Sequence, residues 1–347
     1  MADMKVGLVS DPVYLEHDTG LHPENGRRLK SVLAHIDRSD IKGRLTFLAP
    51  VPATEDELML VHRRAHILHI RQVAEEGGGY LDADTVMSPA SYEVARAAAG
   101  GAMCATGAVL KGEVSSAFAL VRPPGHHALP DRAMGFCLFN NIAIATRWAL
   151  EKGRLERIAV IDFDVHHGNG TQEIFYDNPQ VLYVSTHQYP CYPGTGRMDE
   201  TGSGEAVGAN VNIPLPAGTG DDEYYRVYDE IVTPVVRRFR PELIMVSAGY
   251  DAHWADHLAM ISLTVTGFAG IVRRIKQLAG DLCGGKVVLI LEGGYHPVAL
   301  AESVKATLDI MMGNGEIQDT MGRPKSGLAA PDITPVIRRV KEIHGLG

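Results

Sequence analysis

The sequence has few of the features that mark proteins of membranes or of nucleic acids. Its 347 residues carry a formal net charge of -9, and no block of basic residues occurs that could bind nucleic-acid phosphates. No run of about 18 apolar residues is present, as a membrane-spanning helix would need, and the N-terminus lacks a basic segment followed by an apolar stretch. We therefore expect a cytoplasmic protein that binds neither nucleic acid nor a membrane; assembly into a homo-oligomer stays open.

Cysteine is scarce and scattered. The four cysteines include no Cys-x-x-Cys pair and are Cys104, Cys137, Cys191 and Cys283. This spacing argues against a structural zinc cluster and against a disulfide framework, and it favours reduced thiols.

The chain also lacks internal repeats, low-complexity linkers and shifts in composition. A single domain covering residues 1–347 is the simplest organisation.

What the sequence does contain is an alternation of strand and helix patterns. Short, continuous apolar runs predict buried strands at residues 6–9, 117–121, 158–163, 181–185, 243–247 and 287–291. Helical periodicity lies between them at residues 56–75, 91–111, 141–151, 222–239 and 266–279. This alternation predicts an α/β fold with a mostly parallel sheet covered by helices on both faces. Residues 189–220 are rich in Gly and Pro and are expected to form a long functional loop.

Polar clusters directly follow four of the predicted strands. They begin at Arg122, Asp162, Ser247 and Glu292. In open parallel sheets ligands bind at the carboxyl ends of the strands. We therefore expect the four clusters to converge in space, although they are remote in sequence.

The second cluster, Asp162-Phe-Asp164-Val-His166, has the pattern of a metal site. Alternate residues of an extended chain share one face, so Asp162, Asp164 and His166 are predicted to lie together. An apolar strand that runs into three such groups is hard to explain as a solvated loop. Two carboxylates and one imidazole leave positions open on a divalent ion, as a catalytic site requires. Zinc there would promote hydrolysis of an amide or ester, although the oxygen-rich set also suits Fe2+ or Co2+.

Two other clusters offer groups that move or donate protons. His126 and His127 follow a rigid Pro-Pro-Gly bend, and adjacent histidines at a strand end are typical of acid–base catalysis. Tyr295 follows two glycines that permit a close backbone approach, and its phenol could donate to a developing oxyanion. Taken alone, Tyr295 fits a packed tyrosine with a satisfied hydroxyl equally well.

As a set, these motifs resemble those of the histone deacetylase superfamily, which includes acetylpolyamine amidohydrolases and acetoin-utilisation proteins. The matching segments are His17-Asp-Thr-Gly, His22-Pro-Glu, Arg122-Pro-Pro-Gly-His-His, Gly135-Phe-Cys-Leu-Phe-Asn-Asn141, residues 162–170 and Glu292-Gly-Gly-Tyr295. They stand in the family's order and cover roughly residues 4–313, which leaves residues 314–347 as a C-terminal extension. The resemblance implies one deacetylase domain with a three-layer, arginase/deacetylase-like fold and a central sheet of about eight strands.

The resemblance also implies a role for each site residue. The implied zinc ligands are Asp164, His166 and Asp251. His127 would be the general base and then the general acid, with His126 as its electrostatic partner supported by Asp162. Tyr295 would polarise the substrate carbonyl. The implied tunnel residues are Gly135, Phe136, Tyr192 and Leu258, and the implied K+ site involves Asp162, Asp164, His166 and Ser185.

Two positions depart from patterns seen in relatives. Many eukaryotic histone deacetylases have Asp where this chain has Asn169, so a neutral amide would orient His127 and raise its imidazole pKa less than a carboxylate would. Leu258 stands where a polyamine-selective relative has a glutamate, which mildly favours acyl-lysine as the substrate. The acidic residues that could instead serve a polyamine at the rim are Asp82, Asp84 and Asp256. Cys137 is interpreted as a core residue and not as a nucleophile.

The predicted activity is removal of an acetyl or other acyl group from lysine side chains of a peptide or protein by zinc-activated water. The first alternative is an acetylpolyamine amidohydrolase that acts on small acylated amines. An arginase-like enzyme with two Mn2+ ions would need more carboxylates than these clusters supply. A non-catalytic acyl-lysine binding protein is disfavoured because the ligand set, both histidines and Tyr295 are all present.

Overall fold

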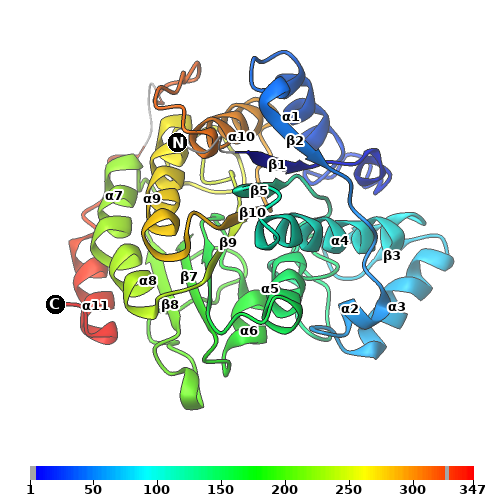
Figure 1. The fold of residues 1–347 in the computed structure, drawn as a ribbon, viewed down its shortest axis with the longest axis horizontal. Helices are drawn as coiled ribbons and strands as arrows, with labels where there is room; N and C mark the ends of the chain where they lie inside the picture. Colours follow the sequence, from blue (N-terminus) through cyan, green and yellow to red (C-terminus); the bar gives the residue numbers. More distant parts are fainter. Residues whose placement is uncertain (1–4, 325–327) are drawn as a thin grey trace.

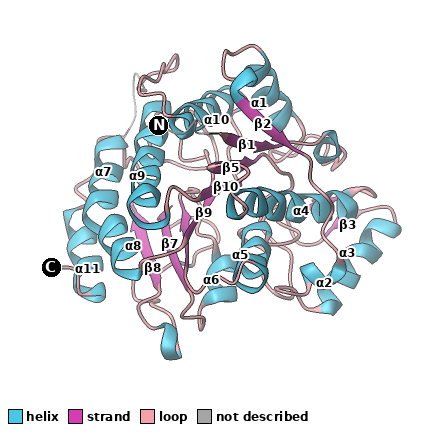
Figure 2. Cartoon of the chain, in the orientation of Figure 1, coloured by secondary structure: helices cyan, strands magenta, loops and turns pink. Residues whose placement is uncertain are grey.

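A computed structural model describes residues 5–324 and 328–347 and contains one large sheet between two layers of helices (Figures 1 and 2). All neighbouring strands of this sheet are parallel. In sheet order the strands are β2 (Leu45–Leu48), β1 (Val6–Val9), β5 (Ser116–Ala119), β10 (Val287–Leu291), β9 (Leu243–Ala248), β6 (Ile158–Asp162), β7 (Val181–Gln188) and β8 (Asn210–Leu215). A separate antiparallel pair is formed by β3 (Gly79–Tyr80) and β4 (Val86–Met87). The expected three-layer α/β fold is confirmed.

Helices cover both faces of the sheet. On one face, neighbouring helices pack in the order α1 (Arg27–Asp37), α10 (Pro297–Met312), α9 (Val265–Cys283) and α7 (Asp221–Val227). The other face carries α4 (Ser91–Leu110), α5 (Asn141–Lys152) and α6 (Asn169–Phe175). The remaining helices are α2 (Glu55–Leu58), α3 (Arg64–Glu75), α8 (Thr233–Phe239) and α11 (Thr334–His344). Short 3-10 turns occur at η1 (Pro12–Leu15), η2 (Lys42–Arg44) and η3 (Gly204–Ala206), and η4 (Tyr228–Val232) is a π turn.

The central strands are apolar along their whole length because helices cover both of their faces. Every residue of β1, β9 and β10 is buried. Burial of each Val, Leu or Ile side chain favours folding by roughly 1.5–3 kcal/mol. The core therefore holds rigid the strand ends from which the polar clusters emerge.

Two helices predicted as continuous are interrupted. Residues 56–75 form α2 and α3, because the N–H of Arg63 between them donates to the carbonyl of Pro130 at 2.7 Å and not to its own chain four residues back. Residues 222–239 form α7, η4 and α8. Pro234, near the start of α8, has no N–H to donate to the preceding turn, and the backbone there adopts the π turn.

The segment 189–220 is not entirely a loop, since it contains η3 and the strand β8. Asn210, Asn212 and Pro214 break the apolar pattern of this strand in the sequence. Pro214 is tolerated because β8 lies at the edge of the sheet, where a missing N–H leaves no neighbouring strand unpaired. The short strand β2, at the opposite edge, was also missing from the predicted set.

Helices long and apolar enough to cross a membrane do not occur within residues 5–324 and 328–347. The four cysteine thiols are free, as the spacing of the cysteines predicted.

Candidate active site

The four polar clusters lie along one edge of the sheet. Strands β5, β10, β9 and β6 are consecutive and parallel, so their carboxyl ends meet there. β5 leads to the histidine pair, β6 to Asp164 and His166, β9 to Asp251 and β10 to Tyr295. The fold thus brings together residues that are remote in the sequence.

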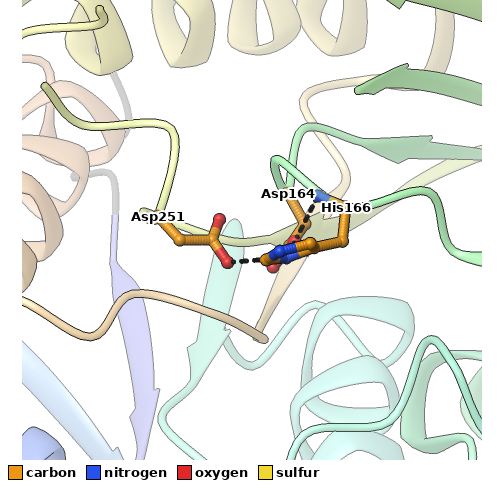
Figure 3. Close-up of side chains that lie close together, drawn as sticks. All are labelled: Asp164, His166 and Asp251. Carbon is orange, nitrogen blue, oxygen red and sulfur yellow. Dashed lines mark hydrogen bonds and ion pairs between the residues drawn. The ribbon is translucent and has the colours of Figure 1, made fainter. Parts of the chain in front are cut away.

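Asp164, His166 and Asp251 form a buried triad (Figure 3). One possible ligand atom from each residue lies within 4.8 Å of the other two. Nδ1 of His166 is 3.2 Å from Oδ1 of Asp164 and 3.2 Å from Oδ2 of Asp251. The prediction that Asp162 lies with Asp164 and His166 on one face of an extended chain is wrong, since Asp162 is not part of this triad. The reason is that β6 ends at Asp162 and the chain is no longer extended beyond it.

The triad fits a divalent metal ion. Backbone N–H groups orient the outer oxygens: Gly293 donates to Oδ2 of Asp164 at 2.8 Å, and Val165 donates to Oδ1 of Asp251 at 3.0 Å. Oδ2 of Asp251 is buried and, among the described residues, has Nδ1 of His166 at 3.2 Å as an ion-pair neighbour but accepts no well-directed hydrogen bond. Burial and the nearby Asp164 raise the pKa of Asp251 to about 6. A cation would relieve the repulsion between the carboxylates and bind this oxygen.

Two glycines allow the backbone to approach the carboxylates. A Cβ atom on Gly249 would lie 2.0 Å from Oδ2 of Asp164, and one on Gly293 would lie 2.0 Å from Oδ2 of Asp251. A side chain at either position would therefore displace a possible metal ligand.

His126 is held by an acidic partner beneath the site. Its Nδ1 lies 3.1 Å from Oδ2 of Asp162, and the Tyr183 hydroxyl donates to the same oxygen at 3.0 Å. Burial alone would lower the pKa of His126, but the charges of Asp162, Asp164 and Glu292 outweigh burial and raise the pKa to about 10. His126 is therefore the cationic member of the histidine pair.

His127 has the opposite electrostatic environment. Burial, together with the charges of His126 and His166, lowers the pKa of His127 well below its usual value. Its Nδ1 lies 2.8 Å from Oδ1 of Asn169. A Cβ on Gly135 would come within 2.5 Å of the His127 ring, so glycine is required beneath this imidazole. Neighbouring groups with pKa values moved apart are typical of an acid and base pair.

Glu292 binds the backbone that carries the histidine pair, a role that the sequence did not predict. Its Oε2 accepts from the backbone N–H of Gly125 at 2.7 Å and of His126 at 3.2 Å, and its Oε1 accepts from the Ser247 hydroxyl at 3.2 Å. Burial raises the pKa of Glu292 to about 7. Its place at the start of the fourth polar cluster was the only signal in the sequence.

A buried ionic network, also missed from the sequence, lies behind the site. Arg122 donates to both carboxylate oxygens of Glu24, at 2.6 and 2.8 Å, and Arg28 donates to Glu24 at 3.0 Å. Arg28 also donates from Nε to the carbonyl of Gly294 at 2.7 Å, and its guanidinium carbon is 4.9 Å from the centroid of the Tyr295 ring. The network connects the N-terminal segment to the strand end that carries Tyr295.

A narrow cavity of about 200 Å³ leads to the triad. Its lining residues are Asp84, His127, Gly135, Phe136, His166, Tyr192, Leu258 and Tyr295. The Phe136 ring meets the Tyr295 ring edge to face at 5.7 Å, and the Tyr192 ring meets the His127 ring at 5.1 Å. All four residues expected to form a tunnel line this cavity.

The acidic rim candidates behave differently from one another. Asp84 lines the cavity, and Asp82 accepts the backbone N–H of Asp84 at 3.0 Å. Asp256 is wrong as a rim residue: it is buried, and its carboxylate accepts backbone N–H groups below the cavity. Cys137 is fully buried and its thiol contacts the carbonyl of Gly135 at 3.2 Å, as expected of a core residue.

The parallel sheet of eight strands, with this site at its carboxyl edge, has the architecture of deacetylase-like amidohydrolases. The model of the histone deacetylase domain matches residues 22–311. The chain belongs to the histone deacetylase family, a family of hydrolases that includes deacetylases and amidohydrolases.

Similar proteins come from archaea and bacteria and include a solved structure. A probable deacetylase of Archaeoglobus fulgidus is 44% identical over 295 residues, which are 84% of this chain and 82% of that protein. A histone deacetylase-like amidohydrolase of Pseudomonas aeruginosa is 42% identical over 290 residues, which are 83% of this chain and 75% of that protein. The crystal structure of the HDA15 HD domain matches with a TM-score of 0.88 at 34% identity and covers 99% of this chain and 95% of that chain.

Proposed function

We propose that this protein hydrolyses N-acylated lysine side chains, usually acetyl-lysine, in a peptide or protein. The observation that carries the proposal is the narrow cavity, of about 200 Å³, that runs between Phe136 and Tyr192 to His166 of the triad. A lysine side chain is a slender four-carbon chain, and aromatic walls would bury its methylenes while its amide reaches the polar groups at the bottom.

The proposed metal is zinc, with Asp164, His166 and Asp251 as its ligands. Bound Zn2+ would supply a Lewis acid that polarises the acyl carbonyl and makes water more acidic. Two observations support this assignment: the three side chains lie close together, and the buried Oδ2 of Asp251 accepts no well-directed hydrogen bond among the described residues. The same oxygen-rich donors also suit Fe2+ or Co2+.

The chain's own side chains would carry the proton transfers. Because Nδ1 of His127 is engaged by Asn169, its Nε2 is left to take the proton of the attacking water and pass it to the leaving amine. Tyr295 would donate to the carbonyl oxygen as that oxygen gains charge. His126, kept protonated beside Asp162, would stabilise the same developing charge.

A kinetic panel tests the proposal. The enzyme, reconstituted separately with zinc and with iron, is assayed on acetyl-lysine peptides, on peptides with longer acyl groups, and on acetylputrescine and acetylspermidine. We expect acyl-lysine peptides to have the highest kcat/KM, since the ratio of these constants measures specificity. Tight binding of an acyl-lysine peptide without turnover of any substrate would contradict the proposal and indicate a binding protein.

A small acylated polyamine is the second candidate substrate, and one observation favours it. Asp84 lines the cavity, and its carboxylate could pair there with a second ammonium group. Leu258 opposes this reading, because it places an apolar side chain on the same wall. The panel decides between the two candidates.

We further propose a structural K+ site and a single-domain organisation. The K+ ligands would come from Asp162, Asp164, His166 and Ser185; the position of Ser185, paired with Asp162 across β6 and β7, supports this. Residues 1–347 would form one deacetylase domain with residues 314–347 as an extension. The packing of α11, which lies in this extension, against β8 supports the single-domain organisation.

A further inference from the structure

Asp256 is a buried carboxylate that lies outside the proposed catalytic set. It is 6% exposed. Its Oδ2 accepts the backbone N–H groups of Tyr295 at 2.6 Å and His296 at 3.0 Å. Its Oδ1 accepts the backbone N–H of Leu258 at 3.1 Å. One side chain thus binds both the strand end that carries Tyr295 and the segment that carries a wall of the cavity.

The peptide group that Asp256 holds is also held at its other end. The N–H of Tyr295 and the carbonyl of Gly294 belong to the same peptide unit, and Nε of Arg28 donates to that carbonyl at 2.7 Å. A cation and an anion therefore fix one peptide plane from opposite sides. Gly294 has φ +118, a conformation available to glycine and costly for other residues, so the backbone beside Tyr295 has little stiffness of its own.

We propose that Asp256 is a positioning residue for the reaction: it fixes the Gly294–Tyr295 peptide, and with it the Tyr295 hydroxyl, while holding Leu258 in the wall of the cavity. The inference rests on the proposed function, because it assigns Asp256 an effect on the step in which Tyr295 donates. This role also explains why a carboxylate is buried at position 256, since an amide side chain could not accept all of the same hydrogen bonds. All three of its partners are N–H donors, and the amide nitrogen of an Asn would face one of them.

Substitution Asp256→Asn, combined with Tyr295→Phe, tests this inference. In the wild-type background Asp256→Asn should lower kcat by about tenfold or more, with a much smaller change in KM, because a donor displaced by about 1 Å loses transition-state contact. In the Tyr295→Phe background, where no hydroxyl remains to be positioned, the same change should lower kcat less than about threefold. A residue that acted only on folding would lower kcat equally in both backgrounds.

The cavity wall provides a second readout. Loss of the bond to Leu258 should change the ratio of kcat/KM for acetylspermidine to that for an acetyl-lysine peptide, and this ratio does not depend on the fraction of folded enzyme. Asp221→Asn is a matched control, since Asp221 also accepts a backbone N–H from a remote segment, that of Thr264 at 2.9 Å. It should alter neither this substrate ratio nor kcat beyond about twofold.

Two outcomes separate this inference from the proposed function. If wild-type enzyme turns over acylated substrates but the two backgrounds lose the same factor, Asp256 is a structural residue and the inference fails alone. If the metal-loaded wild type has no activity on any substrate of the panel, the proposed function and the inference fail together. Should Asp256→Asn be insoluble, Asp256→Ser is used in the same cycle, since its hydroxyl is too short to reach the N–H groups that the carboxylate binds.

Discussion

Nδ1 of His127 lies 2.8 Å from the side-chain oxygen of Asn169, so a neutral amide orients the proposed general base. An amide oxygen fixes the tautomer as a carboxylate would, because it accepts the Nδ1 proton. It does not add the negative charge that would stabilise a protonated imidazole. The base is therefore kept free of a proton to lower pH than a carboxylate partner would allow.

Substitution Asn169→Asp should move the acidic limb of the pH–rate profile. Burial, with the charges of His126 and His166, lowers the pKa of His127. A carboxylate at position 169 would raise that pKa, and a larger fraction of the base would be protonated at a given acidic pH. We expect the acidic limb of kcat/KM to shift to higher pH, measured between pH 5 and 9. Asn178→Asp, remote from His127, is the control, and an unchanged limb in Asn169→Asp would refute the argument.

Tyr295→Phe should lose activity but keep the metal, whereas Asp251→Ala should lose the metal itself. Loss of the phenol is expected to lower kcat about 10²–10³-fold, as for removal of one oxyanion donor, with metal content unchanged. Asp251→Ala is expected to lose the metal, measured by elemental analysis after dialysis. Tyr92→Phe removes a tyrosine hydroxyl that binds Glu55 at 3.1 Å on another part of the molecule and should keep both metal and activity. Retained metal in Asp251→Ala would exclude Asp251 as a ligand.

Leu258→Glu should change substrate preference. The new carboxylate would enter the wall of the cavity and pair with the distal ammonium of a polyamine. We expect the ratio of kcat/KM for acetylspermidine to that for an acetyl-lysine peptide to rise by about tenfold or more. Met260→Glu, two residues away at a position that is 58% exposed, is the matched control. An equal rise in both variants would mean that overall charge, and not position 258, sets the preference.

Neutralising Glu24 should destabilise the fold strongly. This carboxylate is 1% exposed and bound by two arginines, which outweigh the effect of burial and hold its pKa well below its usual range. Removing one partner from a buried ion pair typically costs about 3–5 kcal/mol, so Glu24→Gln should lower the free energy of unfolding by that amount in urea titrations at pH 7. Glu93→Gln, which removes an exposed pair with Arg96, should cost less than about 1 kcal/mol.

The buried His62 should make the protein less stable in mild acid. Burial, followed by the charge of His66, lowers the pKa of His62 from 6.5 to about 3. Between these values the unfolded chain binds a proton that the folded chain does not. The stability that the neutral His62 contributes is therefore complete above the pKa of the unfolded chain and is lost as the pH falls toward the pKa of the folded chain. The free energy of unfolding should fall by about 1.4 kcal/mol per pH unit from this group. His62→Gln should remove that part of the slope, whereas the exposed His69→Gln should leave the slope unchanged.

The sequence predicted the central sheet well because its strands are continuous apolar runs. Each residue of β10, for example, faces a helix layer on one side or the other, and the sequence shows this as an uninterrupted Val-Val-Leu-Ile-Leu. β8 was missed because an edge strand pairs with only one neighbouring strand and so tolerates polar residues and proline. Asn210, Asn212 and Pro214 can occupy it, and they remove the apolar signal.

Asp164 and His166 could be selected from the sequence because they directly follow a buried strand, whereas Asp251 was indicated as a ligand only by the family resemblance. The residues that support these ligands could not be selected. Asp256 binds Tyr295, and Glu24 binds Arg122, across separations that no local pattern encodes. In the sequence Asp256 looked like a surface acid, because its donors on Tyr295 and His296 become neighbours only when β9 and β10 lie side by side.

The order of the strands has a consequence for when the proposed metal site forms. β10 pairs with β5 on one side and with β9 on the other, yet it is the last of the eight strands along the chain. Until it inserts, the two halves of the sheet have no contact through their backbones, and the N–H of Gly293 that orients Asp164 is not in place. A nascent chain therefore lacks a complete form of the proposed metal site before its final strand emerges from the ribosome, and capture of the proposed metal would be coupled to the closing step of folding.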